Sequence, residues 1–66
     1  MIENLGRFVD KTVLITAANG RIFCGKTTDY IYPEDNENGL ESIVVDMTDG
    51  SIIEFTGEDI ETIKIL

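Results

Sequence analysis

Few residues in this chain have side chains that could perform chemistry, and Cys24 is the strongest nucleophile among them. A catalytic cysteine needs a nearby base or a positive neighbourhood to form its thiolate. The chain has no histidine, and Lys26 is the only cation close to Cys24 in the sequence. Period-two alternation places Cys24 on the same strand face as Ile22. These features predict a buried strand cysteine, so no catalytic residue is assigned and no enzymatic activity is expected.

Carboxylates are the most abundant ionisable groups, with 13 Asp and Glu residues against five Lys and Arg. General acid–base catalysis needs a cleft that perturbs their pKa values, whereas a small barrel is filled by its own side chains. The segment from Glu34 to Gly39 has the opening spacing of an EF-hand loop, but Val45 stands where the bidentate glutamate should be. The acids therefore predict a solvated surface, with loose cation binding by Glu34, Asp35 and Glu37 as the alternative. No metal or cofactor is expected.

The formal net charge of −8 limits the classes of partner. A negative field repels the phosphate backbone of nucleic acids, so it favours a basic protein partner and allows only weak binding of single-stranded RNA. Plain solubility explains the same charge equally well. The apolar stretches are far shorter than the roughly 20 residues that span a bilayer, so no membrane association is expected. A single cysteine and the lack of a signal-peptide pattern favour a cytoplasmic location.

Hydrophobic periodicity predicts one domain over residues 1–66, with a short N-terminal helix over 2–9 and five antiparallel strands. Asn19-Gly20 predicts a tight type I′ hairpin because both residues tolerate a positive φ, and Asp49-Gly50 predicts a second tight hairpin. Gly25 lies inside the second strand and predicts a sharp bend. This order is typical of a mainly β fold with a small closed barrel. The strands are expected at 12–18, 21–32, 42–48, 51–55 and 62–66, with a turn at 56–60.

The alternation within each strand also predicts the core. A chain of 66 residues buries only about 60% of the surface that its unfolded form exposes, so its stability is marginal without help. One cysteine excludes an internal disulfide, and self-association remains as the source of extra stability. A homo-oligomer is therefore expected. The residues predicted to be mostly buried are Val13, Ile15, Ile22, Cys24, Ile43, Val45, Ile53, Phe55, Ile63 and Ile65.

Two segments resemble the signature segments of the Sm-like (LSm) proteins. The first runs from Asn19 through Gly25 to Asp29, and the second is the tail 53–63, with Gly57 at its centre. The resemblance covers nearly the whole chain and implies an Sm-like barrel of five antiparallel strands with a short N-terminal helix. A generic SH3-like barrel is the alternative. In Sm-like rings the fourth strand of one subunit pairs with the fifth strand of the next, which implies a ring or a dimer.

The same resemblance implies where a ligand would bind. Sm-like proteins hold a single-stranded base with Asn and Arg side chains while a flat side chain stacks on it. Pro33 and Thr56 stand in the Asn and Arg places here, and Ile31 stands in the stacking place. Tyr30 and Tyr32 flank that place, so a shifted pocket could use one of them. The candidate site for RNA or a protein partner therefore consists of Asp29, Tyr30, Ile31, Tyr32, Thr56 and Gly57.

Retained glycines and missing RNA contacts favour a changed ligand. The layout also resembles the Rho-inhibiting Rof proteins, which are acidic Sm-like barrels that bind a protein. The first hypothesis is therefore a non-enzymatic, acidic Sm-like module that binds a protein partner. The alternative is an Sm-like RNA-binding protein with an altered base pocket.

Overall fold

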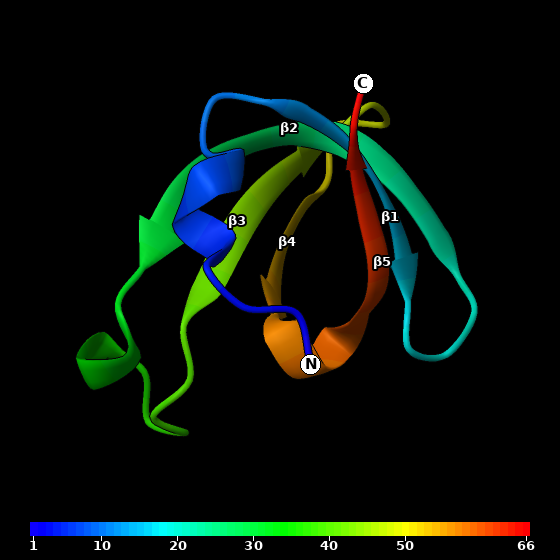
Figure 1. Ribbon diagram of the computed structural model, residues 1–66. Coiled ribbons are helices and arrows are strands. Elements are labelled where there is room, and N and C mark those ends of the chain that lie inside the picture. Colours follow the sequence, from blue (N-terminus) through cyan, green and yellow to red (C-terminus); the bar gives the residue numbers. More distant parts are fainter.

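A computed structural model describes residues 1–66 and consists of five strands with three short 3₁₀ turns (Figure 1). The predicted strands are all present, with ends displaced by one or two residues. The turn expected at 56–60 is present as the 3₁₀ turn η3. The elements are η1 (Leu5–Phe8), β1 (Thr12–Ala17), β2 (Ile22–Ile31), η2 (Pro33–Asp35), β3 (Ser42–Met47), β4 (Ile52–Thr56), η3 (Gly57–Asp59) and β5 (Ile60–Ile65).

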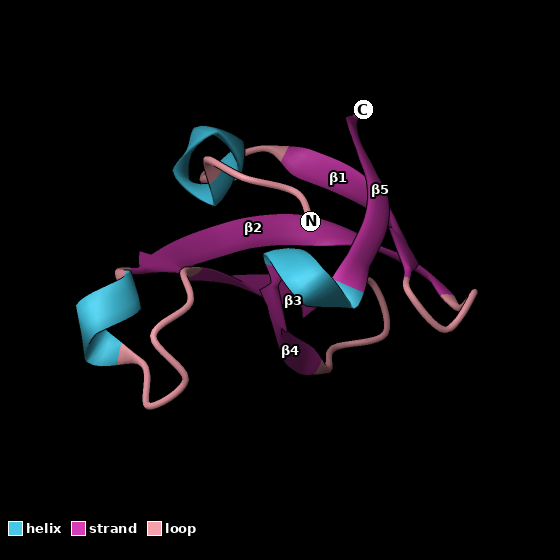
Figure 2. Ribbon diagram, turned by 60° about the horizontal axis from the view of Figure 1, so that its bottom comes forward, coloured by secondary structure: helices cyan, strands magenta, loops and turns pink.

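The strands form one antiparallel sheet in the order β4-β3-β2-β1-β5. The sheet is strongly curved, yet β4 and β5 pair only with β3 and β1 and not with each other (Figure 2). The closed barrel that the sequence predicts is therefore wrong for this chain. Each edge strand is hydrogen-bonded to one neighbour only, β4 to β3 and β5 to β1. The other backbone edge of β4 and of β5 is therefore unpaired.

Both tight hairpins are present, but the turn at Asn19-Gly20 is not of the predicted type I′. Within these two turns only the glycines, Gly20 and Gly50, have a positive φ, at 87° and 90°. In each hairpin the glycine N–H donates to the carbonyl three residues earlier, Ala17 or Met47. This is the longer turn that ends in a left-handed glycine. The side-chain oxygens of Asn19 and Asp49 accept hydrogen bonds from the N–H groups of Arg21 and Ser51, respectively.

Gly25 stands at a close approach of the β2 and β3 backbones, and the irregularity in the pairing of these strands lies further on, between Thr27 and Asp29. Gly25 pairs with Val13 on one side and with Met47 on the other, on the inner face of β2. A Cβ at this position would overlap the Asp46 carbonyl oxygen. Any side chain here would therefore push β2 and β3 apart.

The predicted N-terminal helix is only the four-residue turn η1, which is a second correction. Asn4 and Asp10 adopt positive φ values of 58° and 67° on either side of it, so no regular helix can extend through this segment. Leu5 and Phe8 are three residues apart and therefore eclipse on one side of a 3₁₀ turn. Both side chains are buried where η1 lies over β2 and β3 (Figures 1 and 2).

Half of the predicted core is correct: Val13, Ile15, Ile43, Val45 and Phe55 are buried. Cys24, Ile53 and Ile63 are only half-buried. The prediction is wrong for Ile22 and Ile65, which are 67% and 54% exposed.

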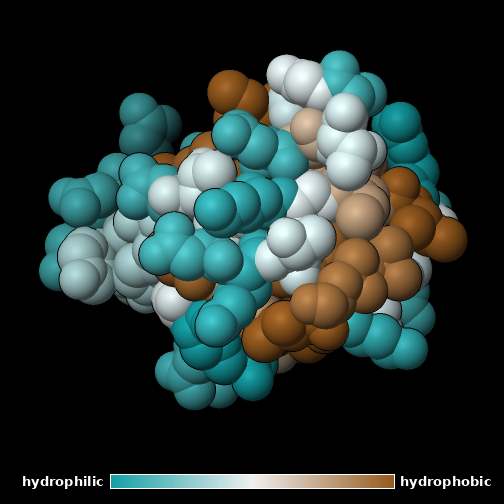
Figure 3. Space-filling view, turned by 90° about the horizontal axis from the view of Figure 1, so that it is seen from above, coloured by the Kyte–Doolittle hydropathy of each residue, from teal (hydrophilic) through white to brown (hydrophobic).

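The register explains the error in β2. Ile15 lies opposite Phe23, which faces inward, so Ile22 and Cys24 face outward. The apolar surface that results gathers on the side of β1 and β5, whereas the side of the Pro33–Leu40 loop is polar (Figure 3). The remaining apolar core residues are Leu5, Phe8, Ala17, Met47 and Ile60.

Candidate functional site

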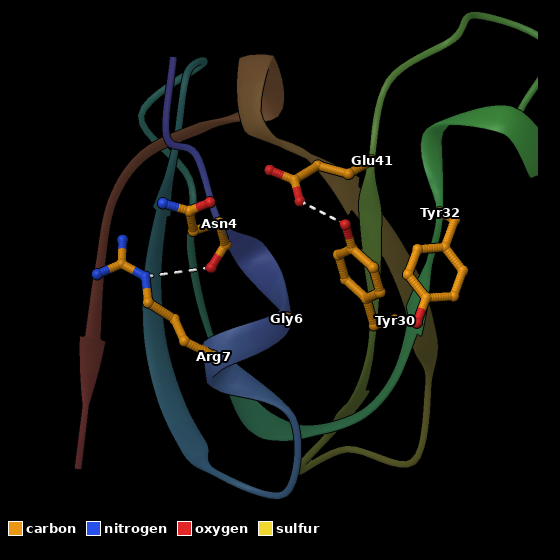
Figure 4. A pocket seen from close by; sticks show the side chains of 6 residues that line it. All are labelled: Asn4, Gly6, Arg7, Tyr30, Tyr32 and Glu41. Atoms are coloured by element: carbon orange, nitrogen blue, oxygen red, sulfur yellow. Dashed lines mark hydrogen bonds between the residues drawn. The ribbon is translucent and has the colours of Figure 1, made fainter.

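The largest hollow lies between η1 and the adjoining ends of β2 and β3 (Figure 4). It has a volume of about 430 Å³ and is open to solvent. We call it the tyrosine groove. Its walls come from the N-terminal segment and from the residues that flank the loop between β2 and β3: Asn4, Gly6, Arg7, Tyr30, Tyr32 and Glu41.

Tyr30 is held at the base of the groove by packing and by one short hydrogen bond. It pairs with Ile43 on the inner face of the sheet, and its ring lies beside Gly6, where a Cβ would be 3.6 Å from the ring. Its hydroxyl donates to Glu41 Oε1 at 2.7 Å. The Leu5 N–H donates to the same oxygen at 3.3 Å. Glu41 therefore ties η1 to the end of β2.

Tyr32 continues the aromatic wall toward solvent. The Tyr30 and Tyr32 rings meet edge to face, with centroids 5.1 Å apart and planes at 88°. The Tyr32 side chain is 60% exposed despite this contact. The pair thus has one ring fixed at the base of the groove and one available at its rim.

The groove has a negative electrostatic environment. The hydrogen bond to Glu41 is the main reason that the pKa of Tyr30 rises to about 12, and burial adds to it. The charge of Glu41 and the nearby Tyr32 and Glu34 raise that pKa further. Tyr30 consequently remains a neutral hydroxyl donor near pH 7, while Glu41 is the acceptor.

Arg7 is the only cation in the groove wall, and its guanidinium is engaged elsewhere. Its Nε and one terminal nitrogen donate to the carbonyl oxygens of Asn4 at 3.2 Å and Glu3 at 3.3 Å. Its Cζ lies 4.6 Å from the centroid of the Phe8 ring. Figure 4 shows the guanidinium turned away from the two tyrosines. The carboxylate of Glu41 is therefore not neutralised by Arg7.

A second hollow adjoins the tyrosine groove and shares Asn4 and Glu41 with it. We call it the Leu40 hollow. It has a volume of about 300 Å³ and lies between the N-terminus and the loop after β2. Its residues are Met1, Glu3, Asn4, Pro33, Gly39, Leu40, Glu41 and Gly57. Asn4 and Glu41 therefore stand between the two hollows.

The structure divides the six predicted site residues among three places. Only Tyr30 and Tyr32 lie in the tyrosine groove. Ile31, Ser42 and Thr56 lie opposite one another across β2, β3 and β4, on the outer face. Asp29 lies on the same outer face, opposite Val44, and its carboxylate accepts from the Tyr30 N–H at 2.8 Å.

Gly57 is covered by the N-terminal residues. The Ile2 N–H donates to the Gly57 carbonyl oxygen at 3.3 Å, and a Cβ at Gly57 would overlap the Ile2 carbonyl oxygen. Thr56 keeps a local role, because its hydroxyl and N–H both donate to Asp59 Oδ2 in η3. The place that the resemblance assigns to an RNA base is thus divided, with Ile31 and Thr56 on the outer face and Gly57 buried.

Glu41 and the N-terminal segment were missed by sequence reasoning. Glu41 lies just before β3, among other acids of the loop, and nothing in its spacing distinguishes it from them. Gly6 did carry a signal, because a glycine within an expected helix often marks a close approach. The contact of Gly6 with the Tyr30 ring is that approach.

The other candidate chemistry does not assemble into a site. Cys24 is half-buried and faces outward with Ile22, opposite Leu14. No three acidic or thiol side chains come close enough together to hold a metal ion. The helical segments are all single 3₁₀ turns, and none is long and apolar enough to cross a membrane.

The chain was compared with models of known protein families, with curated proteins and with solved structures. None of the three comparisons finds a match.

Proposed function

We propose that this chain is a non-enzymatic, acidic interaction module that binds a protein partner through the tyrosine groove. The observation that carries the proposal is the combination of the exposed Tyr32 ring, the anchored Tyr30 ring and the carboxylate of Glu41 in one open hollow. Aromatic rings and a few well-placed polar groups are typical of protein recognition surfaces. A net charge of −8 supports a basic partner surface.

We further propose that the fold is of the Sm-like or SH3-like type. The five-stranded antiparallel sheet supports this, as do the two glycines on which the resemblance rests. Gly25 and Gly57 both stand where a Cβ would overlap a backbone oxygen. Glycine is therefore required at both positions of the resemblance, because any other residue would bring its Cβ against the backbone.

Single-stranded RNA binding is the second candidate, and the exposed Tyr32 ring favours it. An aromatic side chain at a groove rim can stack on any base. The acids around the groove oppose it, because a bound base brings its phosphate close to Glu41 and Glu34. We therefore expect only weak RNA binding, which titration of labelled oligo(U) and oligo(A) at physiological salt would measure.

Affinity capture from the source organism tests the proposal, with bound protein and bound RNA both analysed. The matched variants are Tyr32→Ala in the groove and Ile22→Ala on the outer face, because both residues are exposed apolar side chains. We expect a protein that is retained by the wild type and by Ile22→Ala but lost with Tyr32→Ala. RNA retained in its place, and lost with Tyr32→Ala, would favour the second candidate.

We also propose that the chain forms a homo-oligomer through its two sheet edges. The strand order leaves β4 and β5 each with one unpaired side. Unpaired edges are templates for pairing with another chain. A contact between β4 of one copy and β5 of the next would close into a ring, whereas a self-complementary contact would give a dimer.

A further inference from the structure

We propose that a hollow beside the start of β2 binds an extended segment of a partner protein, which adds to β2 as a short antiparallel strand. The segment carries an apolar residue opposite Phe23 and, two residues later, an aspartate or glutamate opposite Arg21. The hollow lies between residues 21–24 and the β3–β4 hairpin and has a volume of about 220 Å³. We call it the hairpin notch. It shares no residue with the tyrosine groove, so the inference goes beyond the proposed function.

The start of β2 has a neighbouring strand on one side only. The pairing of β2 with β3 begins at Gly25, opposite Met47, which is the last residue of β3. Figure 1 shows β2 continuing past the end of β3, beside β1. The Thr48 N–H still donates to the Cys24 carbonyl oxygen at 3.2 Å, and this is the last hydrogen bond on that side. Residues 21–23 therefore present an unpaired backbone edge to the hairpin notch.

The backbone groups of Ile22 face the hairpin notch. Successive residues of an antiparallel strand direct their N–H and C=O groups alternately to one neighbour and to the other. The Arg21 carbonyl oxygen accepts from the Ala17 N–H and so faces β1, whereas the Cys24 carbonyl oxygen faces Thr48. Ile22 is in phase with Cys24. A partner residue opposite Ile22 would therefore exchange two hydrogen bonds with it, as antiparallel pairs do.

Apolar side chains of the inner face line the hairpin notch. They belong to Phe23, Met47 and Ile53, and of these Phe23 and Ile53 are only half-buried. The Phe23 ring meets the buried Phe55 ring edge to face, with centroids 5.4 Å apart. Side chains directly opposite each other in a sheet point to the same face. An apolar side chain opposite Phe23 would therefore cover this surface and remove it from water.

Arg21 supplies the matching charge for the acid. Its Cζ atom lies 5.4 Å from the centroid of the Phe23 ring, so the two side chains share one face. Its guanidinium donates no hydrogen bond within the chain, unlike that of Arg7, which is bonded to two carbonyl oxygens. Residues two apart on a strand project to the same face. An acid two residues after the apolar one would therefore lie opposite Arg21.

Asp49 determines at which end of the hairpin notch the acid fits. It also lines the notch and follows Thr48, which lies at the Cys24 end. Three residues of a strand span about 10 Å, so an acid at the Arg21 end is well separated from that position. The reverse order, with the acid before the apolar residue, would bring the two carboxylates together. The charges thus favour an apolar residue followed by an acid.

The hairpin notch fits a short partner segment better than a second copy of this chain. Only the positions opposite residues 21–23 are open, whereas the free edge strands β4 and β5 have five and six residues. Two copies of charge −8 also repel each other, and a segment with a single acid is repelled much less. In strand addition the main-chain bonds give affinity, and alternate side chains give specificity.

Titration of the full chain by ¹H–¹⁵N NMR with acetyl-Ala-Leu-Thr-Glu-Ala-amide tests the inference. We expect shifts of the Ile22, Phe23 and Cys24 amide signals, and none at Tyr32 or Glu41. Hydrogen exchange of the Ile22 amide should slow by about fivefold when most of the protein is bound, because that amide gains an acceptor.

Three control peptides examine the parts of the segment separately. Glutamine in place of glutamate should weaken binding by about threefold, because it removes one exposed ion pair. Proline in place of threonine should weaken it by about fivefold, because it removes the N–H that donates to Ile22. The reversed sequence, acetyl-Ala-Glu-Thr-Leu-Ala-amide, should also bind more weakly than the first peptide.

Matched variants test the role of Arg21. Arg21→Gln and Lys26→Gln remove the same charge from exposed positions near the start and in the middle of β2. Arg21→Gln should abolish the preference for glutamate over glutamine in the peptide, whereas Lys26→Gln should retain it. Loss of the preference in both variants would reduce it to a general charge effect and overturn the inference.

Other outcomes would also overturn it. They are an absence of shifts at Ile22 and Cys24, shifts confined to Tyr32 and Glu41, and equal binding of the threonine and proline peptides. Equal binding of the reversed peptide would reject the antiparallel order. Shifts of the Ile22 and Cys24 amides on concentrating the protein alone would assign the hairpin notch to a second copy instead of a partner.

Discussion

The inner face of the sheet has two parts, and the rest of the chain covers one of them more completely than the other. Over β2 and β3, η1 covers the face with Leu5 and Phe8, which are 0% and 4% exposed. Beside the first half of β4 and the second half of β5 the inward-facing side chains are only partly covered, although Phe55 and Ile60 of the same strands are each 4% exposed. We call that region the apolar seam. Ile65 is its most exposed member, and the others are half-buried: Ile53 and Ile63 on the edge strands, and Phe23 at the start of β2.

This difference follows from the length of the chain. A small domain cannot cover all of its apolar surface, and here the N-terminal segment completes only one side of the core. Ile63 and Ile65 pair with Ile15 and Val13, so they face inward; Ile63 packs against the core, whereas Ile65 is 54% exposed. The seam lies along the same edge strands whose backbone groups are unpaired. Apolar surface and unpaired backbone together favour association at this side, whereas the covered side carries the tyrosine groove.

The largest effect is expected from a charge placed in the shared core. Val45 is fully buried on β3, between Thr27 of β2 and Ile53 of β4. Val45→Asp buries an unpaired carboxylate, which costs several kcal/mol, about 3 or more, and should unfold the domain. Val44→Asp is the matched control, because it adds the same charge on the outer face and should stay folded. A melting curve of Val45→Asp that equals the wild type would reject the core assignment.

The two halves can be compared directly with truncations to alanine. Leu5→Ala should destabilise the domain by about 3 kcal/mol, because it leaves a cavity under η1. Ile65→Ala should cost less than about 1 kcal/mol in the monomer, because Ile65 is already more than half exposed. Urea denaturation at low protein concentration measures both. Similar losses for the two variants would show that the seam is covered even in the monomer.

The succession of strands along the chain was predictable from the sequence, but whether the sheet closes into a barrel was not. The hairpin turns depend on local backbone geometry, and their glycines announce it directly in the sequence. Closure depends on whether β4 and β5 meet, which no local pattern encodes. The orientation of β2 was also ambiguous, because Ile22, Phe23 and Cys24 are all apolar and either phase gives a plausible strand. The pairing of Phe23 with Ile15 resolves it.

The site was predicted only in part for the same reason. Tyr30 and Tyr32 were found because they flank the stacking place of the family pattern, and both lie in the tyrosine groove. Glu41 reaches them from beyond a loop, and Gly6 from the N-terminal turn, so both contacts depend on tertiary structure. Ile31 and Thr56 do lie opposite one another across Ser42, but on the outer face. Strand alternation therefore separates the residues that the family pattern places together.

Association at the seam should respond to a charge at one exposed isoleucine and not at another. Ile65→Lys places a charge on the seam, whereas Ile22→Lys makes the same change on the outer face of β2. We expect the wild type and Ile22→Lys to form a homo-oligomer that tightens with salt, because screening weakens the repulsion between copies of charge −8. Ile65→Lys should shift toward the monomer.

Light scattering at two protein concentrations and two salt levels measures this shift. A mass of one chain throughout would reject self-association and leave the seam for a different partner. Equal masses for the two lysine variants would place the contact elsewhere.

The smallest effect on stability is expected from the hydrogen bond between Tyr30 and Glu41, on the side of the sheet that η1 covers. Tyr30→Phe removes the hydroxyl that Glu41 accepts and should destabilise the domain less than Leu5→Ala does, because the ring still packs against Gly6. The folded state raises the pKa of Tyr30 from 10.0 to about 12, chiefly through that hydrogen bond, so it favours the protonated phenol. The stabilising effect is therefore complete below pH 10 and is lost as the pH rises toward 12. Urea denaturation of both proteins between pH 8 and pH 12 should show a wild-type advantage that shrinks across this interval. An advantage that stays constant to pH 12 would mean that the hydroxyl does not interact with Glu41 in solution.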